Sequence, residues 1–231
     1  PVEQLYNRGA AELDDRDYAE AIQYFNEVER QHPYSEWARR ATGIDIDDGL
    51  SIGAFLDGSA IVAGSFFDAV TFAPDTPAET TIMADTILHR DAFIARYDRD
   101  GGFDWVRHLE GIDDDEVAAV ATIAGGSFVV GGTFTTALTL GVGEANETTL
   151  MTDFEFDRNI FVARYNAAGR LEAAERVPAI SAAFDVGVVP GGDVLVGGWI
   201  SGAGTLRDTT GAAIPVRAAG GVDAFLARLD F

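Results

Sequence analysis

The sequence predicts a mainly β protein of about three repeated units, preceded by a short α-helical hairpin. Three observations predict this fold class: one string of residues occurs three times, a second string repeats with nearly the same period, and the first 42 residues have a helical spacing of apolar residues. The hydrophobic content of 47% is enough for a sizeable core in a chain of 231 residues.

The segment of residues 1–42 has the pattern of two helices. A polar break, LDDRDY, separates them, and Pro33 ends the second. A helical hairpin of about 34 residues, with small residues where the helices approach and Pro at its end, is the tetratricopeptide pattern. The residues that recur at steps of three to five positions are Leu5, Gly9, Leu13, Tyr18, Ala21, Phe25 and Val28.

The same segment resembles the first repeat of the BamD-type lipoproteins of the outer-membrane barrel assembly machinery, and the string FNEVERQHPYSEWARRA is its most specific part. The resemblance implies a location in the cell envelope, in the periplasm or at the outer-membrane surface. It also implies protein partners among the outer-membrane assembly components, bound in a helical groove. The further helical repeats of that family do not follow after Thr42. The candidate partner-binding residues are Leu5, Tyr6, Tyr18 and Phe25, with core packing as the alternative role that we favour for them.

Residues 43–231 contain a repeat of 64 to 68 residues. The string DAFIARY begins at Asp91, its equivalent NIFVARY at Asn159, and DAFLARL at Asp223. A second string, GSAIVAGSF, returns as GSFVVGGTF and GDVLVGGWI with shifts of 68 and 66 residues. Two unrelated strings with the same period make the repeat a strong signal. The second string stands at 58–66, 126–134 and 192–200.

Each repeat is predicted to contain two β-hairpins. EVAAVATIAGGSFVVGGTF turns at Gly125 and Gly126, and DAFIARYDRDGGFDWVRHL turns at DRDGG. The looser segment between the two hairpins is expected to hold one short strand. Alternation along the repeated string places one set of side chains on a single face, as core. This set is Phe93, Ala95, Tyr97, Phe161, Ala163, Tyr165, Phe225, Ala227 and Leu229.

Two hairpins give about four strands, which is the make-up of a propeller blade. The region of residues 43–231 resembles the bacterial β-propeller repeats of the SBBP type, whose copies contain strings like DAFVAKYD. A propeller ring needs about four to eight blades, and this sequence supplies about three. We therefore expect that the chain is part of a longer one, that several copies assemble, or that two unrelated segments are joined.

The charge of the chain excludes several classes of partner. It carries 38 acidic and 16 basic residues, a net charge of −22, and every basic residue is Arg rather than Lys. Such a surface repels nucleic-acid phosphates and anionic lipid headgroups. No apolar run approaches the length of a membrane span. Cysteine is absent, which excludes disulfides, thiolate nucleophiles and cysteine-ligated metals.

Acidic clusters at residues 45–49, 98–104 and 113–116 are candidates for calcium binding, because calcium prefers several oxygen ligands from one tight loop. The best spaced are Asp98, Asp100 and Asp104. The equivalent string in the next repeat, NAAGR, has lost these acids, and turn formation explains the same residues equally well.

One Arg recurs in register in each repeat, at Arg96, Arg164 and Arg228, on the face opposite the aromatic residues. Such a series could line an anion-binding channel. The alternative, which we favour, is that each guanidinium pairs with an acid on a neighbouring strand or blade.

The histidines do not predict a catalytic or metal centre. His32, His89 and His108 occupy non-equivalent positions, and none has the spacing of a zinc motif. No serine–histidine pairing, phosphate loop or paired-carboxylate pattern is visible. We expect a non-enzymatic interaction or scaffold protein of the bacterial cell envelope, without a cofactor. Two alternatives remain: a surface or secreted propeller that binds carbohydrate or calcium, and a structural protein that self-assembles through the strand edges near residues 43 and 231.

Overall fold

The structure, a computed structural model, divides the chain into two compact units, Pro1–Ala41 and Thr42–Phe231. The predicted helical hairpin, with Leu5, Tyr6, Tyr18, Phe25 and His32, lies outside the described residues, apart from Arg8, which is helical. Thr42, which the sequence pattern assigned to the hairpin, instead begins the first strand. The described residues are 8, 42–43, 48–84, 86, 88–153, 158–177, 180–190, 192–207 and 213–229.

The described part of the second unit is built of β-strands, as the repeat predicted. In chain order the strands are β1 Thr42–Gly43, β2 Asp48–Ala54, β3 Ala60–Phe66, β4 Ala69–Phe72, β5 Thr80–Met83, β6 Asp91–Tyr97, β7 Phe103–Gly111, β8 Glu116–Thr122, β9 Phe128–Thr135, β10 Ala137–Leu140, β11 Thr148–Met151, β12 Arg158–Tyr165, β13 Leu171–Val177, β14 Ile180–Val188, β15 Val194–Arg207 and β16 Ala213–Leu229.

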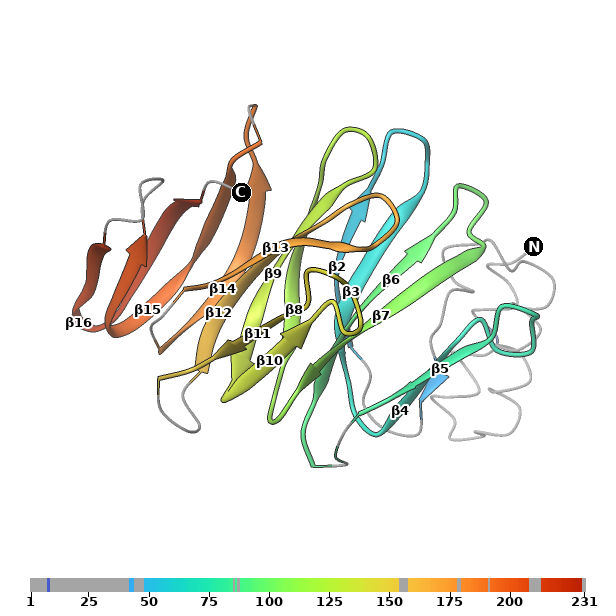
Figure 1. The fold of residues 1–231 in the computed structure, drawn as a ribbon, viewed down its shortest axis with the longest axis horizontal. Helices are drawn as coiled ribbons and strands as arrows, with labels where there is room; N and C mark the ends of the chain where they lie inside the picture. The colour runs from blue at the N-terminus through green and yellow to red at the C-terminus, as the bar shows by residue number, and fades with distance from the viewer. Residues whose placement is uncertain are drawn as a thin grey trace. The chain divides into compact units, whose positions relative to one another are not determined.

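The strands form antiparallel sheets that follow the repeats (Figure 1). The first sheet has the order β2-β3-β6-β7 and continues through β7 into the hairpin β10-β11. The second sheet is β8-β9-β12-β13, and the third is β14-β15-β16. A small sheet, β1-β4-β5, completes the described part. The described residues show open sheets, and no closed barrel or ring is assigned to them.

The first two repeats therefore contain the two predicted hairpins each, as four-stranded antiparallel meanders. The looser segment between them was predicted with one short strand, and this is wrong, because it forms a two-stranded hairpin, β4-β5 or β10-β11. Threonines opposite each other explain part of its stability: Thr71 and Thr81 share a hydrogen bond of 2.9 Å between their hydroxyls, as Thr139 and Thr149 do at 3.0 Å. Neighbouring Thr side chains stabilise such cross-strand pairs.

The tight turns have the same backbone hydrogen bond in each repeat. The amide of Phe55 donates to the carbonyl of Ser59, and the equivalent amides of Ile123 and Val189 donate in the same way. The predicted turn at Gly125 and Gly126 is confirmed, with φ angles of 89° and 92° that favour glycine. The repeated string thus encodes the same local geometry in each copy.

A β-bulge at one position of each repeat explains a repeated glycine. The pairing register shifts between Gly49 and Ser51 in the first sheet and, 68 residues later, between Val117 and Ala119 in the second. A Cβ atom placed on Gly64 would lie 1.8 Å from the carbonyl oxygen of Asp48. At the equivalent Gly132, the carbonyl oxygen of Glu116 would lie 1.9 Å away. Only glycine leaves room for the bulged strand to approach so closely.

The sheets pack face to face in chain order, so β6 and β12 are buried on both faces. Between the first and second sheets, aliphatic side chains of the first meet aromatic side chains of the second. Between the second and third sheets the cluster is almost entirely aliphatic. The predicted core set is confirmed in large part: Phe93, Ala95, Phe161, Ala163, Tyr165, Ala227 and Leu229 are buried, and Tyr97 and Phe225 are half-buried.

We predict that Gly64→Ala and Gly132→Ala each lower the free energy of unfolding by about 1–3 kcal/mol, since the added methyl group overlaps the carbonyl oxygen of the bulged strand. Urea denaturation followed by far-UV circular dichroism measures this change.

The matched control is Gly197→Ala, in the same repeated string of the third sheet, where no atom lies within 4 Å of the added methyl group. This variant should unfold as the unmodified chain does or slightly later. Equal destabilisation of all three variants would contradict the role of the bulge.

Candidate functional site

The three repeated arginines each lie beside a carboxylate of their own repeat, as the favoured alternative expected. Nε of Arg96 is 3.6 Å from Oδ2 of Asp104, and Nε of Arg164 is 3.0 Å from Oε2 of Glu172. Arg228 pairs with Asp193. Asp104 and Glu172 occupy equivalent positions, where the register of β6-β7 and β12-β13 shifts by one residue. Each repeated cation therefore joins its strand to an acid on a neighbouring strand or turn of the same sheet.

Arg96 also connects the first sheet to the second. Its Nη1 donates to the carbonyl oxygen of Ala167 at 3.0 Å, in the turn between β12 and β13, and its Nη2 donates to Oγ of Ser59 at 3.1 Å. The guanidinium lies 4.9 Å from the ring centre of Phe55. The guanidinium of Arg96, which an anion-binding channel would require, is therefore engaged in contacts within the protein.

The proposed calcium residues Asp98, Asp100 and Asp104 are placed in a turn and an ion pair. Oδ1 of Asp98 accepts the amide hydrogens of Asp100 and Gly102, at 2.8 and 2.7 Å. At the equivalent position in the next repeat, Oδ1 of Asn166 accepts two amide hydrogens in the same way. A neutral amide thus performs the same task, which is the chemistry of an Asx turn. In the described part of the chain, no three His, Cys, Asp or Glu side chains group as metal ligands.

We predict that Asp98→Asn leaves the free energy of unfolding within about 0.5 kcal/mol of the unmodified chain, because the acceptor oxygen is kept. Asp98→Ala should lower it by about 1–3 kcal/mol, since two amides lose their acceptor. Urea denaturation of both variants, with and without calcium, measures the difference. A calcium-dependent rise in stability that Asp98→Asn abolishes would show that the carboxylate binds metal instead.

One histidine forms a hydrogen-bonded pair with a buried acid. Nε2 of His108, on β7, lies 2.6 Å from Oδ2 of Asp91 on β6, and its ring is 5.4 Å from that of Phe66. Equivalent positions in the second repeat hold Asn159 and Arg176, so the pair is absent from that repeat. A carboxylate can orient an imidazole for proton transfer, but here the pair joins two adjacent strands beside an aromatic cluster.

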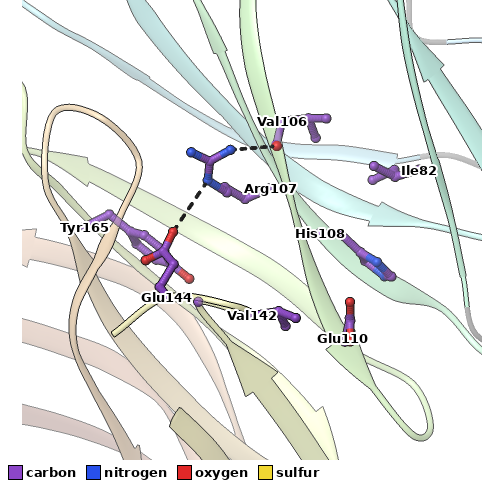
Figure 2. A pocket seen from close by; sticks show the side chains of 9 residues that line it. Ile82, Val106, Arg107, His108, Glu110, Val142, Glu144 and Tyr165 are labelled. Atoms are coloured by element: carbon purple, nitrogen blue, oxygen red, sulfur yellow. Dashed lines mark hydrogen bonds and ion pairs between the residues drawn. The ribbon is translucent and has the colours of Figure 1, made fainter. Parts of the chain in front are cut away.

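Two cavities of similar size border the second sheet. The first, of about 360 Å³, lies over β7 and receives the side chains drawn in Figure 2. The second, of about 350 Å³, is lined by Phe67, Leu88, Arg90, Asp114, Asp115, Glu116 and Arg158.

The charged groups of the first cavity hold two sheets together. Nε of Arg107 donates to the carbonyl oxygen of Gly169 at 3.0 Å, and Nη2 donates to that of Ala168 at 3.2 Å. Oε2 of Glu144 accepts the amide hydrogen of Leu171 at 2.7 Å. Figure 2 shows Arg107 and Glu144 turned toward each other. The strand β7 and the loop after β10 are thereby attached to the turn between β12 and β13.

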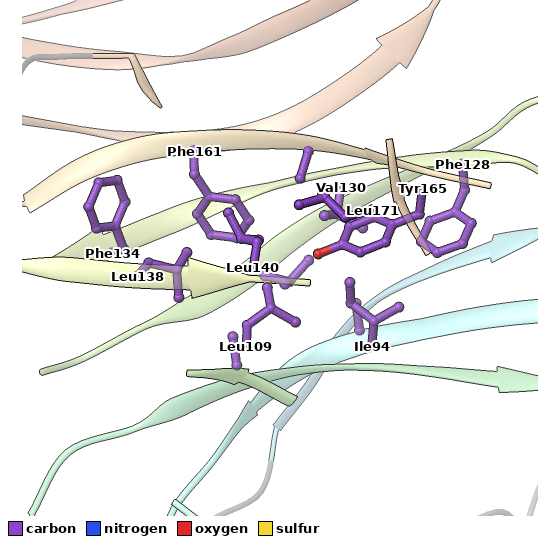
Figure 3. Close-up of a cluster of buried hydrophobic side chains, with 14 of the residues drawn as sticks. Ile94, Leu109, Phe128, Val130, Phe134, Leu138, Leu140, Phe161, Tyr165 and Leu171 are labelled. Carbon is purple, nitrogen blue, oxygen red and sulfur yellow. The ribbon is translucent and has the colours of Figure 1, made fainter. Parts of the chain in front are cut away.

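Tyr165 forms the inner wall of this cavity. Its hydroxyl is buried and has no hydrogen-bond partner among the described residues. Figure 3 shows the ring among apolar side chains, with Phe128, Leu140 and Leu171 close to it. Burial raises the pKa of the phenol, and the nearby Glu144 raises it further, while Arg107 acts in the opposite direction. The neutral phenol therefore acts as part of the core.

The second cavity contains the most perturbed carboxyl group of the described part. Asp115 is 1% exposed, in the connection from the first sheet to the second. Its Oδ1 accepts the amide hydrogen of Thr135 at 3.2 Å, and its Oδ2 has no hydrogen-bond partner among the described residues. Burial raises the pKa of Asp115 to about 9, and the neighbouring Asp91, Asp113 and Asp114 contribute to the rise. At neutral pH this side chain is therefore a neutral carboxylic acid.

Gly111 explains how Asp115 is accommodated. A Cβ atom on Gly111 would lie 1.3 Å from Oδ2 of Asp115, so the carboxyl group occupies the space that a side chain would fill. Around it, the hydroxyl of Thr136 donates to Asp113 at 2.6 Å, and the amide of Arg90 donates to Asp114 at 3.1 Å. The acidic cluster 113–116, a calcium candidate in the sequence, thus positions the connection between two sheets.

The sequence did not single out Asp91, His108 or Asp115 as a group. Asp91 lies in the repeated string, which the sequence analysis interpreted as architecture, and Asp115 lies in a run of acids that was considered only for calcium binding or turn formation. The sequence contains one sign of the position of Gly111. The string GID occurs twice, at residues 43–45 and 111–113, and this repetition indicates a position where glycine is required.

The similarity to a known protein lies in the N-terminal segment of the chain. No family model matches the chain. An N-terminal segment of 41 residues is 63% identical to the outer membrane protein assembly factor BamD of Caulobacter vibrioides. This segment is 18% of this chain and 13% of that protein. The chain thus spans a small part of the relative that it matches. In the described residues no helix has both the length and the apolar character to cross a bilayer.

We predict that the free energy of unfolding falls as the pH rises from 5 to 8, by up to about 1.4 kcal/mol per pH unit from Asp115 alone. In the unfolded chain this carboxyl is ionised above its ordinary pKa near 4, whereas the folded protein holds the proton up to about 9. The folded state therefore binds one more proton in this range, and raising the pH favours unfolding. Urea denaturation at several pH values measures the slope.

The variant Asp115→Asn should remove this part of the slope, because the amide cannot ionise. Asp100→Asn is the matched control, because it removes an exposed carboxyl, in the turn between β6 and β7, that is not among the groups that raise the pKa of Asp115. Equal slopes for the unmodified chain and Asp115→Asn would show that Asp115 does not hold its proton in the folded state.

Proposed function

We infer that this chain is a non-enzymatic interaction or scaffold protein of the bacterial cell envelope, linked to outer-membrane protein assembly. The observation that carries the proposal is the 63% identity of the 41-residue N-terminal segment to the assembly factor BamD. Identity at this level keeps most of the side chains of the 41-residue segment unchanged. A surface that recognises the same partners is the simplest consequence.

The second unit supports the scaffold part of the proposal. Its repeated strings serve turns, bulges and sheet packing, as the equivalent hydrogen bonds and glycines indicate. We infer that its sheets are blades of a propeller-like array, since each of the first two is a four-stranded antiparallel meander stacked on the next. Such an array is a rigid body with many exposed loops, suited to holding partners.

The proposal does not require catalysis. The groups with raised pKa values, Asp115 and Tyr165, are both buried at contacts between sheets. The pair of His108 and Asp91 joins adjacent strands. A role in packing explains the position of each of these residues.

We predict that Tyr18→Ala and Phe25→Ala each weaken binding of the whole chain to a purified outer-membrane assembly component by about tenfold or more, since large aromatic anchors dominate protein interfaces. Leu5→Ala and Tyr6→Ala should act in the same direction. Biolayer interferometry with the whole chain immobilised measures the dissociation constants, and circular dichroism checks that each variant is folded.

The control variant carries Met83→Ala and Met151→Ala, two equivalent exposed side chains at the outer strands of β4-β5 and β10-β11. It should bind as the unmodified chain does. Absence of binding to any assembly component, or equal weakening by the control variant, would contradict the proposed function.

A further inference from the structure

We propose that the second cavity binds a small organic carboxylate with an apolar body, held by the guanidinium groups of Arg90 and Arg158 and by the carboxyl group of Asp115. This inference goes beyond the proposed interaction function and does not depend on it.

The cavity lies beside the connection from β7 of the first sheet to β8 of the second. Its volume of about 350 Å³ is within the range of sites for small ligands. Arg90 directly precedes β6 of the first sheet, and Arg158 begins β12 of the second, 68 residues later. The two arginines are thus equivalent in the repeat, and the structure brings both to one cavity. Two guanidinium groups in one cavity are suited to an oxyanion.

The hydrogen-bond donors of both arginines are largely unused within the described part of the chain. Nη1 of Arg90 is 3.5 Å from Oδ2 of Asp48, and Nη2 of Arg158 is 3.6 Å from Oε1 of Glu116. These ion pairs are longer than a hydrogen bond of roughly 2.7–3.2 Å. Arg158 donates one hydrogen bond, from Nε to Oγ1 of Thr133, and the guanidinium of Arg90 donates none to any described residue. Their remaining N–H groups are available to a ligand.

Asp115 supplies a third polar group, and its packing leaves one oxygen unused. Oδ1 accepts the amide hydrogen of Thr135, whereas the buried Oδ2 has no hydrogen-bond partner among the described residues. A buried polar atom without a partner requires an explanation. Because burial raises the pKa of Asp115 to about 9, the side chain is a neutral acid at pH 7 and has a hydrogen to donate. A carboxylate oxygen of the ligand accepts that hydrogen.

An apolar surface borders these polar groups. The ring of Phe67 is half-buried, and its centre lies 5.0 Å from the guanidinium carbon of Arg90. Leu88 lines the same cavity and is 75% exposed. Sites for small molecules combine apolar walls with a few polar groups that fix the orientation of the ligand. The apolar body of the ligand therefore covers Phe67 and Leu88 while its carboxylate contacts the arginines.

The charge of the lining favours a ligand with a single negative charge. Arg90 and Arg158 are balanced by Asp114 and Glu116, so the lining has no net charge while Asp115 holds its proton. The net charge of −22 opposes ligands with several negative charges. In about 0.15 M salt, charges more than about 8 Å apart are largely screened, so a single carboxylate is governed by the groups that it touches.

Isothermal titration calorimetry of the whole chain with phenylacetate, at pH 7 in 0.15 M salt, tests the inference. We expect saturable binding with one site per chain. Phenylacetamide has nearly the same shape but no charge, and it should bind about tenfold more weakly, since charged acceptors form the stronger hydrogen bonds. Absence of saturable phenylacetate binding would show that the cavity holds water alone, and would overturn the inference.

Arg158→Gln should weaken phenylacetate binding by about fivefold or more, because a charged donor is lost, and Arg90→Gln should act in the same direction. The matched control is Arg99→Gln, which makes the same charge change at a side chain 75% exposed in the turn between β6 and β7. Its dissociation constant should stay within about twofold of the unmodified chain. Equal weakening by Arg158→Gln and the control would reveal only an effect of net charge, and would reject the site.

Asp115→Asn tests the buried donor. The amide provides an acceptor for Thr135 and a donor for the ligand, so phenylacetate binding should stay within about threefold of the unmodified chain. A tenfold gain in affinity would show that the unmodified Asp115 is ionised and repels the ligand, which contradicts its role as donor.

Nuclear magnetic resonance of the ¹⁵N-labelled, unmodified chain locates the site without relying on the folding of any variant. The Nε–H signals of Arg90 and Arg158 should shift on addition of phenylacetate and stay in place with equal phenylacetamide, while the signal of Arg99 should not move. Shifts confined to other arginines would place the ligand elsewhere and overturn the inference.

Discussion

Face-to-face packing of neighbouring sheets is the constraint on which the described part of the second unit depends. A four-stranded sheet has two faces, and in the first two repeats the middle strands β6 and β12 have no exposed face. Ile94 and Val162 on one face, and Phe93 and Phe161 on the other, illustrate this. Burial of each such side chain stabilises the fold by about 1.5–3 kcal/mol, so the packing of one sheet depends on the presence of the next.

This packing explains why polar groups gather at the connections between sheets. A chain that passes from one sheet to the next must bring backbone groups under a neighbouring sheet, and these groups require partners. Asp115 supplies one by accepting the amide hydrogen of Thr135. Between the same two sheets, Arg107 supplies donors for the carbonyl oxygens of Ala168 and Gly169, in the turn between β12 and β13. The buried carboxyl and the cross-sheet arginine are therefore consequences of stacking.

The two parts of the chain contribute differently to the proposed role. The N-terminal segment carries the similarity to an outer-membrane assembly factor, and with it the proposed choice of partners. The repeated sheets carry architecture, since the first two have equivalent turns and equivalent β-bulges. In a repeat protein the departures from equivalence distinguish one repeat from another; an example is the pair of Asp91 and His108, where the second repeat has Asn159 and Arg176.

The sequence by itself determined the local features that depend on residues close together in the chain. Its repeated strings predicted the hairpins, the turn at Gly125 and Gly126, and the alternation that buries Phe161 and Ala163. The pairing of each repeated arginine with an acid was also expected from composition and register.

Only the tertiary structure decided which faces are covered, because burial depends on what another part of the chain brings to a position. The strings at β6 and β16 are nearly the same, yet Ile94 is buried and Leu226 is exposed. The raised pKa of Asp115 has the same origin. Its carboxyl group is enclosed because Gly111 leaves space and residues from two sheets surround it, and neither fact is contained in the run of acids in which it stands.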